Sequence, residues 1–224
     1  MSKMGLEAIH PKKRRQSLDK SHPECSIYPY LLSNYHNDKK QVVATTPNEV
    51  WSADITYIRV RGGHMYLSAI IDWHSRAILS YKISNTIDAS LVVDTLKEAI
   101  ATYGIPRIVN TDQGSQYRSK EHIRLLEENG IQISMMGFPE NACIFGVYCG
   151  KGRSIDNIAI ERFFRTLKYD EIYLNEYKDA GELKRGVARF IDFYNCKRFH
   201  SSLGYKKPMN VYLEGIRKEV KNVA

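Results

Sequence analysis

The sequence predicts an α/β domain with a mixed, five-stranded sheet flanked by helices. Three observations indicate this fold class. Stretches rich in β-branched and aromatic residues begin after Asn48 and are separated by short turn signals. Segments with helical periodicity follow, and strands and helices then alternate along the chain. The 224 residues are 43% hydrophobic and 26% charged, which suits one well-cored domain with appendages and excludes a disordered chain.

Three antiparallel strands are expected at the start of this domain. The stretches rich in Ile, Tyr, Val and Leu are 55–61, 64–73 and 76–84. Gly62 and Gly63 separate the first two and are typical of a tight hairpin. Residues 72–75, Asp-Trp-His-Ser, fit a second turn. Asp72, directly before that turn, is expected to be solvated.

Two helices and two short strands are expected next. The helices are predicted at 88–103 and 119–129, and the strands at 107–110 and 131–134. Asp88 fits an N-cap, and Gly104 and Gly130 fit C-terminal stops. Because the strands are separated by helical segments, the sheet should be mixed rather than wholly antiparallel.

Two longer helices, 155–174 and 180–195, are expected to complete the domain. On a helical wheel of the first, the apolar side chains gather on one face: Ile155, Ile158, Ala159, Phe163 and Leu167. Glu161 falls on the other side, in a stripe with Asn157, Arg165 and Lys168. A carboxylate beside an amide and two cations fits a metal ligand bordered by phosphate-binding groups.

Three carboxylates are the candidate chemistry of the chain. Asp54 is expected at the start of the first strand and Asp112 just past the strand 107–110, a position where α/β folds present reactive groups. Together with Glu161 they offer the hard oxygen ligands that suit Mg²⁺. Singly, Asp54 could be a turn former and Glu161 half of a surface ion pair with Arg165. Jointly, on a basic chain, they favour a metal site.

The charge of the chain points to a polyanionic partner. The formal net charge is +8 and the pI about 9.2, which favours nucleic acid over a membrane. The first twenty residues carry no apolar core typical of a signal peptide. Four scattered cysteines lack metal-binding spacing, and a zinc site around His22 and Cys25 would match no common template. These features predict a cytoplasmic protein with free thiols.

Several motifs resemble the integrase core of insertion-sequence transposases, in particular the second open-reading-frame product of the insertion-sequence-three family. They are WSADITYI at 51–58, TDQGSQY at 111–117, GKGRSIDN at 150–157, ERFF at 161–164 and LKY at 167–169. The family's C-terminal signature is resembled by Tyr194, Asn195, Arg198, residues 200–205 and Pro208. Phe199 stands where relatives usually carry proline.

The resemblance implies a ribonuclease H-like fold and a DDE catalytic triad formed by Asp54, Asp112 and Glu161. In such a site the triad holds two Mg²⁺ (or Mn²⁺) ions. One activates water or a DNA 3′-hydroxyl, and the other stabilises the leaving oxygen. The implied reaction is DNA cleavage and strand transfer. The side chains expected to grip phosphates near the cut are Arg153, Asn157, Arg165 and Lys168.

The resemblance also implies partners and boundaries. The expected partners are DNA, as element ends and as target, and further copies of the chain in a homo-oligomer on DNA. The protein would then be nucleoid-associated when bound. Residues 1–47 are expected to be a basic linker left from an upstream DNA-binding region, 48–212 the catalytic core with a C-terminal helical extension, and 213–224 a tail.

The segment 136–149 departs from the family pattern as an apolar insertion between the second and third carboxylates. It is expected to be the least ordered part of the core and to impair activity. Two alternatives therefore stay open beside the transposase. One is a catalytically dead DNA-binding protein on the same fold. The other is a ribonuclease H-type nuclease, which uses similar carboxylates on an RNA–DNA hybrid.

Overall fold

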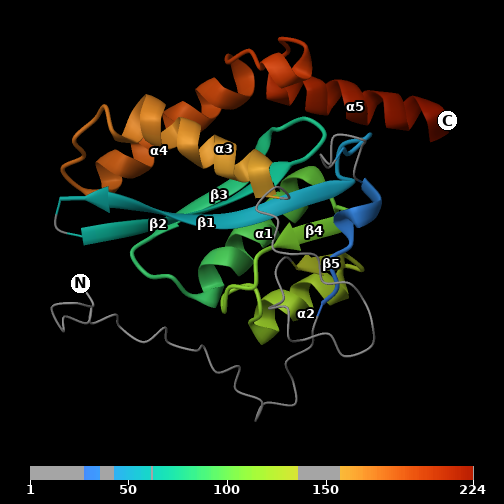
Figure 1. Ribbon diagram of the computed structural model, residues 1–224, viewed down its shortest axis with the longest axis horizontal. Coiled ribbons are helices and arrows are strands. Elements are labelled where there is room, and N and C mark those ends of the chain that lie inside the picture. The colour runs from blue at the N-terminus through green and yellow to red at the C-terminus, as the bar shows by residue number, and fades with distance from the viewer. Residues whose placement is uncertain (1–27, 36–42, 62, 136–156, 224) are drawn as a thin grey trace, which may run out of the picture.

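The computed structural model describes residues 28–35, 43–61, 63–135 and 157–223, and a mixed five-stranded sheet lies at their centre (Figure 1). The strands are β1 (Val50–Val60), β2 (Gly63–Asp72), β3 (Ile78–Ser84), β4 (Ile108–Thr111) and β5 (Gln132–Met135). Their order across the sheet is β3-β2-β1-β4-β5. The first three strands pair antiparallel, whereas β4 pairs parallel with both β1 and β5. The predicted mixed sheet is confirmed.

Helices cover both faces of this sheet. They are α1 (Ala89–Tyr103), α2 (Lys120–Glu128), α3 (Ile158–Leu167), α4 (Ala180–Cys196) and α5 (Pro208–Val223). Figure 1 shows α3 and α4 over one face and α1 and α2 over the other. Asp88 and Ser119 cap α1 and α2 by accepting backbone N–H groups with their side chains, and the Asp88 cap was predicted.

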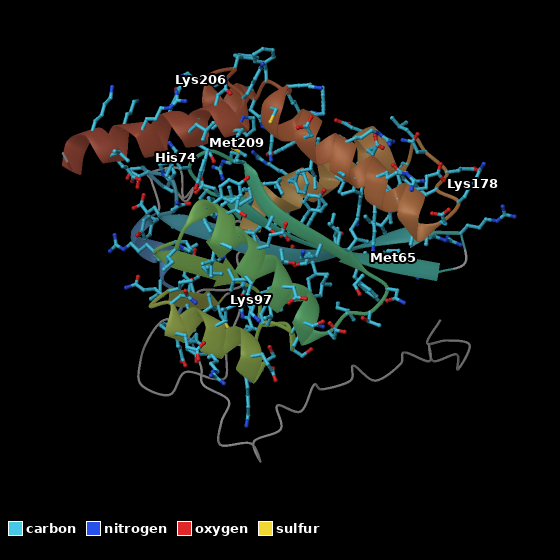
Figure 2. The ribbon with its side chains drawn as sticks, turned by 180° about the vertical axis from the view of Figure 1, so that it is seen from behind. Met65, His74, Lys97, Lys178, Lys206 and Met209 are labelled. Atoms are coloured by element: carbon cyan, nitrogen blue, oxygen red, sulfur yellow. The ribbon has the colours of Figure 1, made fainter. Side chains whose placement is uncertain are left out.

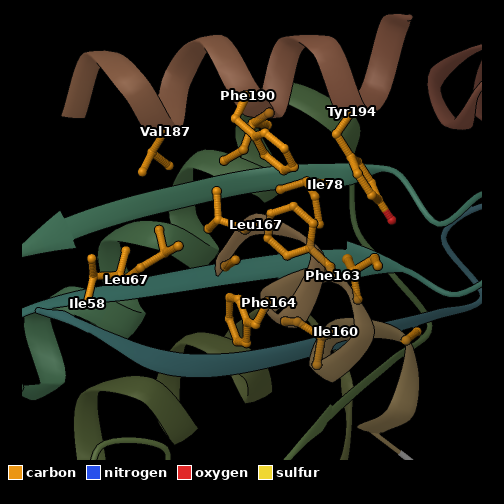
Figure 3. Close-up of a cluster of buried hydrophobic side chains, with 14 of the residues drawn as sticks. Ile58, Leu67, Ile78, Ile160, Phe163, Phe164, Leu167, Val187, Phe190 and Tyr194 are labelled. Carbon is orange, nitrogen blue, oxygen red and sulfur yellow. The ribbon is translucent and has the colours of Figure 1, made fainter. Parts of the chain in front are cut away.

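The alternation of side chains along β1 divides the interior into two cores. Val50 and Ile58 point into a core beneath α3 and α4, with aromatic side chains such as Phe163 (Figure 3). Trp51 and Ala53 point into the other core, beneath α1 and α2. Because successive strand residues face opposite sides, Asp54 lies on the face covered by α3.

β1 begins five residues before its predicted start. Its first four residues are all buried, since helices cover both faces there, so the segment lacks the alternation expected of a half-exposed strand. Asp54 therefore lies inside β1 rather than at its beginning. In this position its backbone is fixed by pairing with Ala69 of β2.

The helix carrying Glu161 is shorter than the predicted 155–174. It begins at Ile158, with Asn157 at the N-cap, and its α-helical part ends at Leu167. A π-helical segment, Lys168–Ile172, continues it, and the Tyr173 amide donates to the Lys168 carbonyl at 2.8 Å. Periodicity at 3.6 residues per turn does not distinguish this wider turn from an α-helix.

One expectation about a polar residue was wrong. Asp72 is fully buried rather than solvated. Its carboxylate accepts hydrogen bonds from the Ser75 amide (2.7 Å), the Ser75 hydroxyl (2.6 Å) and the Asn48 amide (3.0 Å), and burial raises its pKa. The residues expected as a tail from 213 are helical to Val223, so α5 runs across the boundary drawn at 212.

α5 packs on the domain through its first turns. Figure 2 shows it from behind, with Met209 near its start. Met209 and Tyr212 contact the core beneath α1, and the Tyr212 hydroxyl donates to Asn48 Oδ1 at 3.0 Å. These contacts hold α5 against the residues just before the start of β1.

The C-terminal signature joins α4 to the edge strand β3. Asn195 Nδ2 donates to the Ile78 carbonyl at 2.8 Å, and the Ile78 amide donates to Asn195 Oδ1 at 2.9 Å. The Tyr194 ring packs edge-on against Phe163 (Figure 3), and also against His200. The motif thus fixes the layer that carries Glu161.

Some predictions fall outside the described residues. They concern 1–27, the insertion at 136–149 and the phosphate contact of Arg153. Of the expected linker, Leu32 is described and is fully buried against the core beneath α3. Within the described ranges, no helix is long and apolar enough to cross a membrane.

Candidate active site

Asp54 lies on β1, the middle strand of the sheet, just past the point where the pairing of β1 with β4 ends. The last β1–β4 pair is Ser52 with Asn110, so the edge of β1 facing β4 is open beyond it. The Ile55 amide donates to Asp54 Oδ1 at 2.8 Å. Burial, together with the negative charges of Asp112 and Glu161, raises the pKa of Asp54 to about 7, against lowering contributions from the Ile55 hydrogen bond and the Lys168 charge.

Asp112 follows the last residue of β4 and is held by a glycine turn. The Gly114 amide donates to Asp112 Oδ1 at 2.9 Å. A Cβ atom at position 114 would lie 2.9 Å from that same oxygen and 3.0 Å from Gln116 Oε1. A side chain at position 114 would therefore displace the ends of the Asp112 and Gln116 side chains, and glycine lets the backbone approach the carboxylate without that shift.

Glu161 is carried on the exposed side of α3. The opposite side buries Ile160, Phe163, Phe164 and Leu167 against the sheet (Figure 3). Partial burial raises the pKa of Glu161 above its ordinary value. The helix is thus anchored by its apolar face while its carboxylate stays within electrostatic reach of Asp54.

The structure brings two of the four predicted phosphate-binding residues beside these carboxylates. The Lys168 ammonium lies near Asp54 and 4.8 Å from the centre of the Tyr57 ring. Arg165, one turn after Glu161, stacks over Tyr169. Asn157 is only 4% exposed, which argues against contact with DNA in this conformation.

Two tyrosines beside the carboxylates were not predicted as part of the site. Tyr117 is enclosed, and burial raises its pKa, with the charges of Asp54 and Asp112 adding to the effect. Its carbonyl accepts from His122 Nδ1 at 3.0 Å, and burial lowers the His122 pKa to about 4. Tyr57 is exposed. The sequence signal for both was their place in the motifs at 51–58 and 111–117.

The donor set fits divalent metal ions. It consists of carboxylate oxygens, the ligands that Mg²⁺ prefers, and repulsion by the charges of Asp112 and Glu161 adds to burial in raising the pKa of Asp54. A cation among them would relieve this repulsion and favour the ionised form of Asp54. Within the described ranges, no three Asp, Glu, His or Cys side chains already form a compact ligand group, so the side chains would have to close around an ion.

Models of one protein family match most of the chain. Both matching models describe an integrase core domain, and they cover residues 44–137 and 144–208. The gap between the two matches lies within the predicted insertion at 136–149.

Curated relatives are transposases. The chain is 34% identical over 162 residues to the putative transposase InsK of insertion sequence IS150 from Escherichia coli, covering 71% of this chain and 53% of the relative. It is 36% identical to the transposase of IS904 from Lactococcus lactis, covering 74% and 61%. A transposase-like protein of Haemophilus influenzae is 31% identical, covering 77% and 74%. The chain thus spans between half and two thirds of the length of the first two.

Solved structures with the same fold are retroviral integrase cores. The HTLV-2 integrase catalytic core, solved in complex with magnesium, superposes with a TM-score of 0.55 at 18% identity, covering 75% of this chain and 98% of that one. The catalytic core of BIV integrase gives a TM-score of 0.56 at 18% identity, covering 77% and 99%. The predicted ribonuclease H-like fold is confirmed.

Proposed function

Because the chain belongs to the integrase core family of insertion-sequence transposases, we propose that it cleaves DNA and joins DNA strands in transposition. The observation that carries this proposal is the setting of Asp54, a half-buried carboxylate whose pKa is raised by burial and by two further carboxylates from separate elements. Such a group is costly to fold without a cation, and perturbed carboxylates of this kind gather at functional sites.

We propose that Asp54, Asp112 and Glu161 are the catalytic and metal-binding residues, with two Mg²⁺ or Mn²⁺ ions. Bound ions of this kind stabilise the attacking and leaving oxygens of a phosphodiester. The contribution of the protein is to hold the three carboxylates in position. Asp54 is fixed by strand pairing, Asp112 by the Gly114 turn and Glu161 by the buried face of α3. The HTLV-2 core was solved in complex with magnesium, which supports the use of a divalent metal ion.

Lys168 and Arg165 are proposed to hold the phosphates that flank the cut. Both follow Glu161 on α3 and its π-helical extension, and neither forms an ion pair within the described residues. Their charges are therefore available to a polyanion. Arg153 remains a proposed contact, and Asn157 would need to become exposed to serve as one.

The wider assignments follow from the same family membership. We propose residues 48–212 with the rest of α5 as the catalytic unit and 1–47 as the linker to it. The partners would be element ends, target DNA and further copies of the chain assembled on DNA, in the cytoplasm at the nucleoid. An intasome of simian T-cell lymphotropic virus shares the fold, with a TM-score of 0.57 at 18% identity, and supports such an assembly.

A strand-transfer assay tests the function. A labelled duplex carrying the DNA that flanks the gene of this chain is incubated with the protein, a target plasmid and Mg²⁺. We expect metal-dependent cleavage and joining by the wild type, and loss of both in Asp112→Asn. Asp94→Asn is the matched control, because Asp94 is exposed on α1. Equal activity of the wild type and Asp112→Asn would contradict the proposed catalytic role of Asp112. Cleavage of RNA–DNA hybrids without cleavage of duplex DNA would favour the ribonuclease H-type alternative.

A further inference from the structure

A row of side chains leads away from Glu161 along one side of its helix. At steps of four residues it comprises Glu161, Arg165, Tyr169 and Tyr173. The guanidinium carbon of Arg165 lies 5.7 Å from the centre of the Tyr169 ring. The Tyr169 and Tyr173 rings are 5.4 Å apart, edge to face. Neighbours in the row therefore touch from Arg165 onward.

The π-helical segment keeps this row straight. In an α-helix of 3.6 residues per turn, positions four apart drift steadily around the axis. The wider turn at Lys168–Ile172 turns through a smaller angle per residue and offsets that drift. Tyr169 and Tyr173 thus remain on the side of Glu161 and Arg165. Single π turns inside α-helices are frequently found at functional sites.

The two rings are exposed rather than used in packing. Tyr169 is 62% exposed and Tyr173 is 66% exposed, although large aromatic side chains usually bury most of their surface. The helix beneath them is held by the buried Ile172 and Leu167. The rings are therefore presented on a rigid support, at little cost in conformational freedom when a flat ligand binds.

Two cations adjoin the first of the two rings. Arg165 and Lys168 flank Tyr169 along the chain, and both lie over tyrosine rings. Two acids lie between the rings in sequence, and both have partners: Asp170 forms an ion pair with Arg198, and Glu171 Oε1 accepts a hydrogen bond from the Tyr177 hydroxyl at 2.7 Å. Exposed aromatic rings among unpaired cations are the combination by which proteins bind single-stranded nucleic acid, since cations take the phosphates and rings stack on the bases.

We propose that Tyr169 and Tyr173 stack on unpaired bases of the DNA strand that passes Glu161. This inference rests on the proposed function and defines its substrate more closely. Bases inside a duplex are stacked on one another and offer no free face to a protein ring. The preferred substrate would therefore be DNA that is single-stranded or melted next to the scissile phosphate.

Fluorescence of 2-aminopurine tests the stacking directly. The full 224-residue chain is titrated into a duplex with an unpaired overhang containing 2-aminopurine, and into a fully paired duplex. We expect the wild type to quench the overhang probe. The double variant Tyr169→Leu/Tyr173→Leu should bind the overhang about tenfold more weakly, without quenching, and bind the full duplex as the wild type does.

Matched variants separate stacking from other effects. Tyr169→Phe/Tyr173→Phe keeps the rings and should bind and quench like the wild type. Tyr205→Asn removes a 72% exposed tyrosine outside the row, at a positive φ of 59° that asparagine tolerates, and should change nothing.

Three results would overturn the proposal. The first is equal overhang binding and quenching by the wild type and the leucine variant. The second is loss of self-association in the leucine variant, seen by sedimentation, with DNA binding intact, because the rings would then contact a second copy. The third is a wild-type protein that binds neither the overhang duplex nor the fully paired duplex, and this result would contradict the proposed function as well. If the wild type binds the paired duplex but the first result is obtained, only the stacking proposal fails and the proposed function stands.

Discussion

The Lys168 ammonium lies 4.8 Å from the centre of the Tyr57 ring, at the edge of β1 that β4 leaves open. The same charge lowers the pKa of Asp54, and burial in turn lowers the pKa of Lys168. Lys168 thus links an exposed ring, the central carboxylate and the end of α3. It stands where a phosphate could be drawn toward Asp54.

Lys168→Ala should weaken DNA binding only in part. Removing one phosphate contact lowers the salt slope of log K by about 1 and leaves the other cations in place. Fluorescence anisotropy from low to high salt measures the slope. Lys178→Ala is the control, because Lys178 is exposed in the loop before α4 (Figure 2). Equal slopes for wild type and Lys168→Ala would exclude the contact.

Asp54 should make the metal-free protein less stable as the pH rises. Its folded pKa is about 7 against an ordinary value of 3.8, so the folded state holds the proton more tightly between these values. Its contribution to stability is full below about pH 4 and is lost as the pH passes 7. The loss is on the order of a few kcal/mol.

Thermal unfolding in EDTA at pH 5 and pH 8 measures this effect. The melting temperature of the wild type should fall more between these values than that of Asp54→Asn. His122, with a pKa lowered to about 4 by burial, gains stability as the pH rises, but it does so in both proteins. Parallel falls in the two proteins would show that Asp54 does not titrate as described.

Gly114→Ala should reduce activity without unfolding the protein. The new methyl group would meet Asp112 Oδ1 at 2.9 Å and push this exposed carboxylate from its position. A displacement of this size costs catalysis about a hundredfold at most, while the mobile side chain spares the fold. Gly63→Ala is the control, since its methyl would meet no atom within 4 Å. Cleavage rates measure the loss of activity, and melting temperatures show whether the fold is intact. Full activity of Gly114→Ala would contradict the proposal that the turn positions Asp112.

Asn195→Ala should destabilise the protein by about 2 kcal/mol or more, because the amide and carbonyl of Ile78 would lose their partners inside the protein. Urea unfolding measures the difference. Asn210→Ala, at an exposed position of α5, should leave stability nearly unchanged. If both variants unfold alike, the signature residue does not hold α4 to β3.

Much of the fold could be predicted because the local signals agreed with the tertiary structure. The hairpin between β1 and β2, the Asp88 cap and the strand–helix alternation all lie where the sequence indicated. The start of β1 was missed because burial on both faces removes alternation. The extent of α5 was missed because its helical pattern past residue 212 was read as a tail.

The site could be predicted only as a set of residues. Motif positions named Asp54, Asp112 and Glu161, but parallel pairing of β1 with β4 and the packing of α3 bring their elements together. The open edge beside Tyr57 depends on β4 being four residues long. The row from Glu161 to Tyr173 depends on a π-helical segment that no period in the sequence revealed.

Anomalous diffraction from a crystal soaked in Mn²⁺ tests the central claim most directly, because it locates the ions independently of catalysis. The account predicts manganese peaks in contact with the carboxylates of Asp54, Asp112 and Glu161, and their loss in Asp54→Asn. Manganese bound elsewhere, or none at these three carboxylates at a concentration that supports cleavage, would contradict it.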